Sequence, residues 1–361
     1  MSDLFSEPPP SSRRPAGKAA KPAAQPDTGA TPAYDASAIE VLEGLEPVRR
    51  RPGMYIGGTD ETALHHLAAE VLDNAMDEAV AGHASTIDVT LSVGNRLTIR
   101  DNGRGIPVDP HPRFPDRSAL EVILTTLHAG GKFSGKAYAT SGGLHGVGSS
   151  VVNALSSRME VEIARDRAIW QQAYERGLPV TPLEKTGATQ NRRGTQIAFV
   201  PDTQIFGTHQ FVPARLYKLC RSKAFLFRGV TIRWACDPAL IKSGDDTPTE
   251  AVLHFPGGLA DSLTDELGPN APLLTPLWAG DAALPPAADG TDNGRVEWAV
   301  AFLESGSAAL ASDRHTIPTP HSGTPAAGSR THPVTGLPPW GAPAPYQKTT
   351  PLTPHTVRGS A

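Results

Sequence analysis

The segment best suited to chemistry is residues 70–78, where carboxylates and one amide recur at helical spacing. In a helix, Glu70, Asn74 and Glu78 follow one another at intervals of one turn, so their side chains form a row on one face. Like charges at this spacing repel each other by roughly a few tenths of a kcal/mol per pair. A cation would relieve the repulsion, and Mg²⁺ favours a few hard oxygen ligands together with phosphate oxygens. An ordinary solvated acidic face is the alternative for this segment taken alone.

The opposite face of the same helix is apolar, which predicts that the helix packs against a core. The apolar positions are Leu64, Leu67, Ala68, Val71, Leu72, Ala75 and Ala79. The acidic row is therefore expected to point away from that core.

A further carboxylate follows a predicted β-hairpin. Residues 86–100 alternate apolar and polar side chains and turn at residues 94–95, as a hairpin does. Asp101 continues the parity of Leu97 and Ile99, so its side chain is expected on the buried face of the sheet. A carboxylate there needs a hydrogen-bond donor, and the sequence offers no obvious one. The glycines in residues 102–107 allow the backbone to approach a flat or bulky group, with an ordinary loop as the alternative.

A glycine-rich segment at residues 132–148 separates two predicted helices, at residues 119–128 and 149–155. Its free backbone amides, the following helix N-terminus and nearby lysines predict a phosphate cradle. The segment matches neither the P-loop pattern nor the dinucleotide fingerprint. His145 within it could act as a metal ligand or a base, or could simply pack or donate one hydrogen bond.

The remaining elements predict an α+β sandwich with helices on one face of a sheet. Strands are expected at residues 159–164, 168–174, 194–200 and 230–235, and helices at residues 34–44 and 212–226. The basic run at residues 49–51 is either a DNA-binding patch or, as three basic residues usually are, a solvated turn.

Composition limits the possible classes of protein. The 361 residues carry a net charge of −4, so no basic field over the whole chain favours nucleic acid, and a DNA contact would need a local patch or a partner subunit. Cys220 and Cys236 form neither a disulfide framework nor a metal-ligand pattern, which fits a reducing, cytoplasmic setting. No apolar run is long enough to predict a membrane span. Residues 1–33 lack large apolar side chains and predict a disordered tail rather than an amphipathic transit peptide.

The ordered set of motifs resembles the nucleotide-binding motifs of the GHKL ATPases. The motifs are Glu70-x-x-Asp73-Asn74-x-x-Asp77-Glu78, then Asp101-x-Gly103-x-Gly105, then Gly-Leu-His-Gly-Val-Gly at residues 143–148. Residues 34–57, 128–133 and 141–148 are similar to the ATPase subunits of type IIA DNA topoisomerases, meaning the B subunits of DNA gyrase and of topoisomerase IV. Residues 45–53 and 133–136 favour the topoisomerase IV branch.

This resemblance implies a role for each matching residue. Glu70 would be the general base that activates water, and Asn74 would bind Mg²⁺. Asp101 would accept a hydrogen bond from the adenine amine of ATP, with Thr195 supporting that contact through water. The pocket would be shaped by Gly103, Gly105, Ile106 and Pro107, with Arg104 pairing Glu78 at its mouth.

The resemblance also implies mobile parts and partners. A lid over the ribose and phosphates would include Gly131, Lys132, Tyr138, Leu144, His145, Gly146, Val147 and Gly148. Tyr34 and Ile39 would belong to an arm that crosses to a second copy of the chain, so that ATP binding closes a homodimer. The expected partners of such a protein are the topoisomerase A subunit and DNA.

The resemblance implies a GHKL (Bergerat) ATPase domain at residues 34–245 and a partial transducer domain, similar to ribosomal protein S5, at residues 246–318. In the family that second domain returns a lysine to the γ-phosphate. Residues 293–303 resemble one of its strands, but residues 319–361 are rich in Pro, Thr, Ser and Gly and predict a disordered tail. Lys348 resembles the family lysine only superficially.

The metal-binding toprim domain of the family has no counterpart in the sequence, and a truncated or frame-shifted gene is one hypothesis for this change. Two functions remain: an ATP-hydrolysing part of a topoisomerase B subunit, or a nucleotide-binding module or nonfunctional fragment that hydrolyses ATP poorly.

Overall fold

The computed structural model describes residues 42–129, 147–283, 295–304, 309–314, 317–318 and 356–360. The predicted disordered tail at residues 1–33 lies outside the described residues. So does most of the helix expected at residues 34–44. Its last three residues are described and are not helical, and Gly44 there has a positive φ of 60°.

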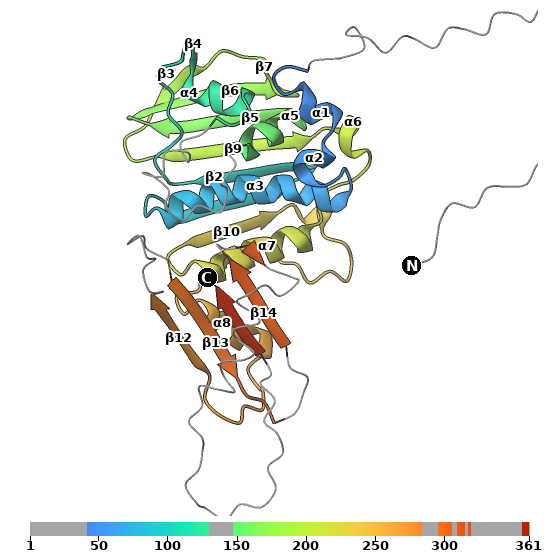
Figure 1. Ribbon diagram of the computed structural model, residues 1–361, viewed down its shortest axis with the longest axis vertical. Helices are drawn as coiled ribbons and strands as arrows, with labels where there is room; N and C mark the ends of the chain where they lie inside the picture. Colours follow the sequence, from blue (N-terminus) through green and yellow to red (C-terminus); the bar gives the residue numbers. More distant parts are fainter. Residues whose placement is uncertain are drawn as a thin grey trace, which may run out of the picture. The chain divides into compact units, whose positions relative to one another are not determined.

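A nine-stranded mixed sheet forms the centre of the fold (Figure 1). Its order is β11-β10-β1-β2-β9-β5-β6-β7, with β8 also paired to β6. Within it β1 pairs with β10 in parallel, while the other pairs are antiparallel. The bounds are β1 (Thr86–Ser92), β2 (Arg96–Asp101), β5 (Ser156–Arg165), β6 (Ala168–Glu175), β7 (Leu178–Pro179), β8 (Glu184–Ala188), β9 (Gly194–Pro201), β10 (Thr231–Cys236) and β11 (Glu250–Leu253). The predicted hairpin and the four further predicted strands are thereby confirmed.

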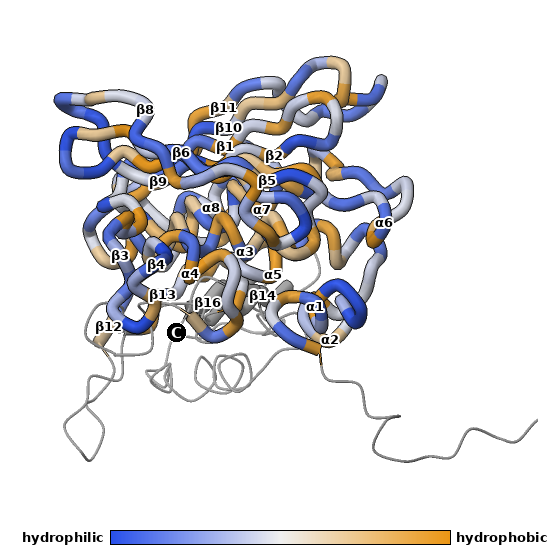
Figure 2. Tube along the Cα trace, turned by 90° about the horizontal axis from the view of Figure 1, so that it is seen from above, coloured by the Kyte–Doolittle hydropathy of each residue, from blue (hydrophilic) through white to orange (hydrophobic). Residues whose placement is uncertain are grey.

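The main helices lie on one face of this sheet, as the sequence predicts (Figure 2). They are α3 (Glu61–Val80), α4 (Ala119–Thr125), α5 (Gly148–Ala154) and α7 (Pro213–Leu226). The shorter elements are α1 (Glu46–Arg50), α2 (Gly53–Ile56), α6 (Thr203–Phe206), a 3₁₀ turn at Pro238–Leu240 and a two-stranded ribbon of β3 (Pro110–His111) and β4 (Phe114–Ser118). No described helix has the length and apolar character needed to cross a membrane.

Helix α3 forms because its start is capped and one stripe is apolar. The side chain of Asp60 accepts a hydrogen bond from the N–H of Ala63, which satisfies one of the unpaired amides of the first turn. All seven predicted apolar positions are buried in the core between the helices and the sheet. Their burial holds the polar face of α3 in a fixed orientation.

The basic run at residues 49–51 is not a solvated turn. Residues 46–50 form α1, and the guanidinium of Arg49 donates to the carbonyl of Ala154 and to Oδ2 of Asp202, both at 2.7 Å. Arg176 donates to the same Asp202 oxygen at 2.9 Å. Because Asp202 is almost fully buried, it needs these cations, and Arg49 acts as an internal anchor.

A second sheet has the order β12-β13-β16-β14-β15, and Figure 1 shows it beside α8 (Leu259–Leu267). Its strands are β12 (Trp278–Ala283), β13 (Arg295–Ala301), β14 (Ala309–Arg314), β15 (Ile317–Pro318) and β16 (Thr356–Ser360). Leu259 and Leu263 of α8 pack on Ala299 and Ala301 of β13. The predicted strand at residues 293–303 is therefore present.

One short part of the range predicted as a disordered tail differs from that prediction. Residues 356–360 form β16, which pairs antiparallel with β13 and parallel with β14. A strand in this position satisfies backbone donors and acceptors of both neighbours, which explains why a segment without large apolar side chains can be ordered. The rest of residues 319–361, Lys348 included, lies outside the described residues, and the prediction of disorder stays a prediction there.

Candidate functional site

The acidic row of α3 is not an ordinary solvated face, because each of three carboxylates has a cation or an imidazole against it. Glu70 lies 3.0 Å from Nε2 of His66, Asp73 lies 2.7 Å from Nζ of Lys223, and Glu78 lies 2.7 Å from the guanidinium of Arg104. Burial raises the pKa of Asp73, and the neighbouring Lys223 opposes that rise. The repulsion expected from the sequence is thus offset by three different elements.

Glu70 and His66 form a pair one helical turn apart. The Glu70 side chain is about one-third exposed (33%), so it can reach a bound molecule. The hydrogen bond from His66 fixes one of its carboxylate oxygens, and this hydrogen bond raises the pKa of His66. The sequence analysis missed His66, although its i,i+4 spacing from Glu70 was the available signal.

Asn74 is held in one orientation by a neighbouring helix. Its Nδ2 donates to Oγ of Ser149 on α5 at 3.0 Å. The side-chain oxygen is the only atom of this amide that can bind a cation, so the hydrogen bond decides which way that ligand points. In the described part of the chain, no group of three or more His, Cys, Asp or Glu side chains is placed to hold a metal ion. A Mg²⁺ ion that takes phosphate oxygens fits this donor set, because it needs only one or two protein ligands.

Asp101 is buried at the end of β2, on the side predicted from its parity, and is 7% exposed. The expectation that the protein offers it no donor is wrong. Its Oδ1 accepts hydrogen bonds from the N–H of Gly103 at 2.7 Å and of Thr195 at 3.3 Å. Burial nevertheless raises the pKa of Asp101 to about 6. No described residue donates to its other oxygen, Oδ2.

The loop after Asp101 closes against α3 and β9. The backbone N–H and Nε of Arg104 donate to one oxygen of Glu78 at 3.1 Å, and Nη2 donates to the other at 2.7 Å. A Cβ at Gly103 would lie 2.8 Å from both Asp101 and Glu78, so this position has room only for glycine. The predicted pairing of Arg104 with Glu78 is therefore present in the structure.

The second half of the loop is tied to Thr195 and to a residue that the sequence analysis missed. The N–H of Ile106 donates to Oγ1 of Thr195 at 3.2 Å, while Pro107 is exposed. Gly105 has a positive φ of 75°, and its carbonyl accepts a hydrogen bond from Nη1 of Arg165 at 2.9 Å. Nothing in the sequence links Arg165, on β5, to this loop, because only the pairing of β5 with β9 brings the two together.

The end of the glycine-rich segment reaches Glu70. Gly148 begins α5, and a Cβ there would collide with the Glu70 carboxylate. Val147, just before it, packs against the core. The other predicted lid residues (Gly131, Lys132, Tyr138, Leu144, His145 and Gly146) and the arm residues Tyr34 and Ile39 lie outside the described residues.

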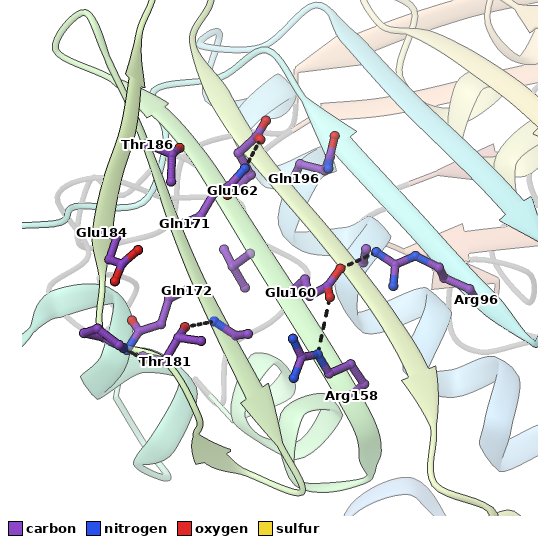
Figure 3. A pocket seen from close by; sticks show the side chains of 14 residues that line it. Arg96, Arg158, Glu160, Glu162, Gln171, Gln172, Thr181, Glu184, Thr186 and Gln196 are labelled. Atoms are coloured by element: carbon purple, nitrogen blue, oxygen red, sulfur yellow. Dashed lines mark hydrogen bonds and ion pairs between the residues drawn. The ribbon is translucent and has the colours of Figure 1, made fainter.

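The opposite face of the sheet has a hollow of about 370 Å³ that is distinct from this site (Figure 3). Its charged side chains neutralise one another: Arg96 and Arg158 both pair with Glu160, at 2.6 and 3.3 Å. Gln171 donates to Glu162 at 2.6 Å. With its charges matched internally, the hollow offers little attraction to a charged ligand.

Comparison with known proteins identifies the family. A family model described as histidine kinase-, DNA gyrase B-, and HSP90-like ATPase matches residues 59–205, which include all three motifs. The crystal structure of the 43K ATPase domain of Thermus thermophilus gyrase B, in complex with an aminocoumarin, is 31% identical with a TM-score of 0.67, and the match covers 88% of this chain and 81% of that one. The chain belongs to the ATPase subunits of the type IIA DNA topoisomerases.

Other members of this family are also similar to the chain. The B subunits of DNA topoisomerase 4 from Bartonella bacilliformis and Caulobacter vibrioides are each 54% identical, over 305 and 309 residues. Each match covers 84% of this chain, and the chain spans 43% of the length of each relative. The ATP-binding domain of Francisella tularensis topoisomerase IV, in complex with a small-molecule inhibitor, is 33% identical with a TM-score of 0.59 over 78% of this type IIA ATPase chain and 70% of that one.

Proposed function

We propose that this chain binds ATP with Mg²⁺ and hydrolyses it, as the N-terminal part of a topoisomerase IV-like B subunit. The observation that carries the proposal is the meeting of the three motifs on one side of the sheet. Gly103 of the second motif lies against Glu78 of the first, and Gly148 of the third lies against Glu70. Residues far apart in the sequence thus border the same polar face of α3.

Asp101 supplies the adenine end of the site. Because both backbone donors use Oδ1, the carboxylate can offer Oδ2 to an exocyclic amine. A buried acceptor without a donor costs about 1–3 kcal/mol, so an amine donor at this position would remove that penalty. Thr195 contacts both Asp101 and the following loop, which keeps the acceptor in place.

Glu70 supplies the hydrolytic end. His66 holds one oxygen of its carboxylate, and the other lies over Gly148 at the start of α5, where it can accept a proton from water. Asn74 would hold the Mg²⁺ ion, which when bound neutralises charge that develops on the transferred phosphoryl group. Glu78 and Arg104 close the loop between the two ends.

The wider action of the protein follows from its family. The glycine-rich residues 131–148 would form a lid over the phosphates, and the arm that bears Tyr34 would cross to a second copy and close a homodimer when ATP binds. The closed dimer would then work in the cytoplasm with a topoisomerase A subunit to pass one DNA duplex through another. The 54% identity to two topoisomerase 4 B subunits favours this branch over gyrase.

The test measures binding and turnover side by side. Calorimetry with a nonhydrolysable ATP analogue reports binding, and steady-state phosphate release reports hydrolysis. We expect both, and both should depend on Mg²⁺. Binding without phosphate release would instead make the chain a nucleotide-binding module, and absence of binding would refute the proposal.

A further inference from the structure

Lys223 is buried in a way that the nucleotide site described above does not explain. Its residue is 2% exposed on α7, and its Nζ lies 2.7 Å from Oδ1 of Asp73 on α3. Lysine is almost never this buried unless it is paired. A buried ion pair contributes little net stability compared with an apolar pair of the same volume. Its presence between these two helices therefore suggests a function in fixing geometry.

The contact is made at the turn of α3 that carries the proposed chemistry. Asp73 follows Glu70 by three positions and immediately precedes Asn74. The side chains of these two site residues are held by His66 and by Ser149. Lys223 acts instead on the neighbouring position from α7, so it limits both rotation and sliding of this turn.

Helix α7 is itself held firmly enough to serve as the reference. Arg221 forms an ion pair with Asp265 of α8, and the ring of Phe225 stacks on Phe255 with a centroid separation of 3.8 Å. Cys220 and Ala224 on the same helix are fully buried in the core. A charge carried by α7 is consequently fixed at its base as well as at its tip.

We propose that Lys223 is a positioning residue for ATP hydrolysis: its ion pair with Asp73 sets the place of Glu70 and Asn74 relative to the phosphates. The inference rests on the proposed function. A displacement of about 1 Å in a reacting group can cost about a hundredfold in rate. The adenine acceptor Asp101 is on β2 and does not depend on this contact, so loss of Lys223 should affect turnover far more than binding.

The experiment compares Lys223→Met with the double variant Lys223→Met/Asp73→Asn. The single variant leaves a buried carboxylate unpaired and should lose stability. The double variant removes both charges at nearly constant volume, so it should recover stability but not the tether. We expect kcat for phosphate release to fall about tenfold or more in the double variant, while the Kd of a nonhydrolysable ATP analogue changes less than about twofold.

The chain offers a matched control. Arg215 on α7 and Glu61 on α3 form an exposed ion pair between the same helices at 2.7 Å, near the other end of α3. Arg215→Met should leave kcat unchanged. Wild-type-like kcat in the stable double variant, or an equal loss in Arg215→Met, would overturn the role of Lys223. Absence of turnover in the wild-type chain would instead overturn the proposed hydrolysis itself.

Discussion

Replacing Asp101 by Asn separates what this carboxylate costs the fold from what it gives to the ligand. The amide oxygen of Asn can keep the two hydrogen bonds from Gly103 and Thr195 that Oδ1 now accepts. The amide nitrogen then occupies the place of Oδ2, so an acceptor becomes a donor that faces the adenine amine. Affinity for ATP should fall by on the order of 2–3 kcal/mol, which is roughly 30- to 150-fold.

The same substitution should stabilise the empty protein at neutral pH. Burial raises the pKa of Asp101 from 3.8 to about 6. A folded-state pKa above the unfolded one means that the folded state prefers the protonated group, so its contribution is present below pH 3.8 and is lost as pH rises through about 6. Two pKa units correspond to about 3 kcal/mol, which is an upper estimate of the stability that Asn regains at about pH 7.5.

Two measurements check this prediction. Calorimetry with a nonhydrolysable ATP analogue gives the affinity, and urea unfolding without nucleotide at about pH 7.5 and about pH 3.5 gives the stability. The gain in stability should be present at the higher pH and absent at the lower one. Asp88→Asn is the control, since Asp88 alternates with the inward residues of β1 and is only half-buried on the other face of the sheet. Unchanged affinity in Asp101→Asn would refute the adenine assignment, and lower stability at the higher pH would refute the argument from burial.

Three further predictions concern titration and catalysis. Because protonated Asp101 cannot accept a hydrogen bond at both oxygens, the Kd for ATP should rise about tenfold per pH unit below about pH 6, and this dependence should vanish in Asp101→Asn. Glu70→Ala should leave ATP binding nearly intact and reduce phosphate release by about 10² or more; a parallel loss of binding would mean that Glu70 is structural. His65 donates through Nδ1 to the carbonyl of Glu61 and accepts through Nε2 from the N–H of Val212, so it is held neutral, and burial lowers its pKa. The unfolded state therefore binds the proton more readily, and stability should fall as pH drops below about 6.5, by at most about 1.4 kcal/mol per pH unit. In urea unfolding at several pH values His65→Gln should show a weaker slope, and an identical slope would contradict this account.

Local patterns in the sequence were sufficient where the physics is local. The stripe on α3 and the parity of Asp101 with Leu97 and Ile99 each predict which face a side chain joins, and both predictions are confirmed. The backbone donors of Asp101 were not predicted, since one of them, Thr195, is placed beside it only by the pairing of β2 with β9.

Contacts between distant elements were beyond such patterns. Lys223 is 150 residues from Asp73, and neither residue differs in type from an ordinary surface charge. Arg49 is similar, because a short basic run carries no sign that a buried carboxylate awaits it from the start of α6. In both cases the deciding quantity is burial, which depends on how whole helices pack.

The parallel pairing of β1 with β10 has a consequence for the order in which the chain folds. Thr86 pairs with Thr231, so this ladder closes a very long loop, whereas β2, β9, β5 and β6 pair over shorter stretches of chain. Long-range pairing is slow because the entropy of loop closure is lost before contacts compensate for it. On a ribosome the antiparallel half, with Asp101 and Thr195, is complete in sequence before Thr231 is synthesised. We expect the nascent chain to expose the edge of β1 until β10 arrives, which makes that edge the point where premature association between nascent chains would begin.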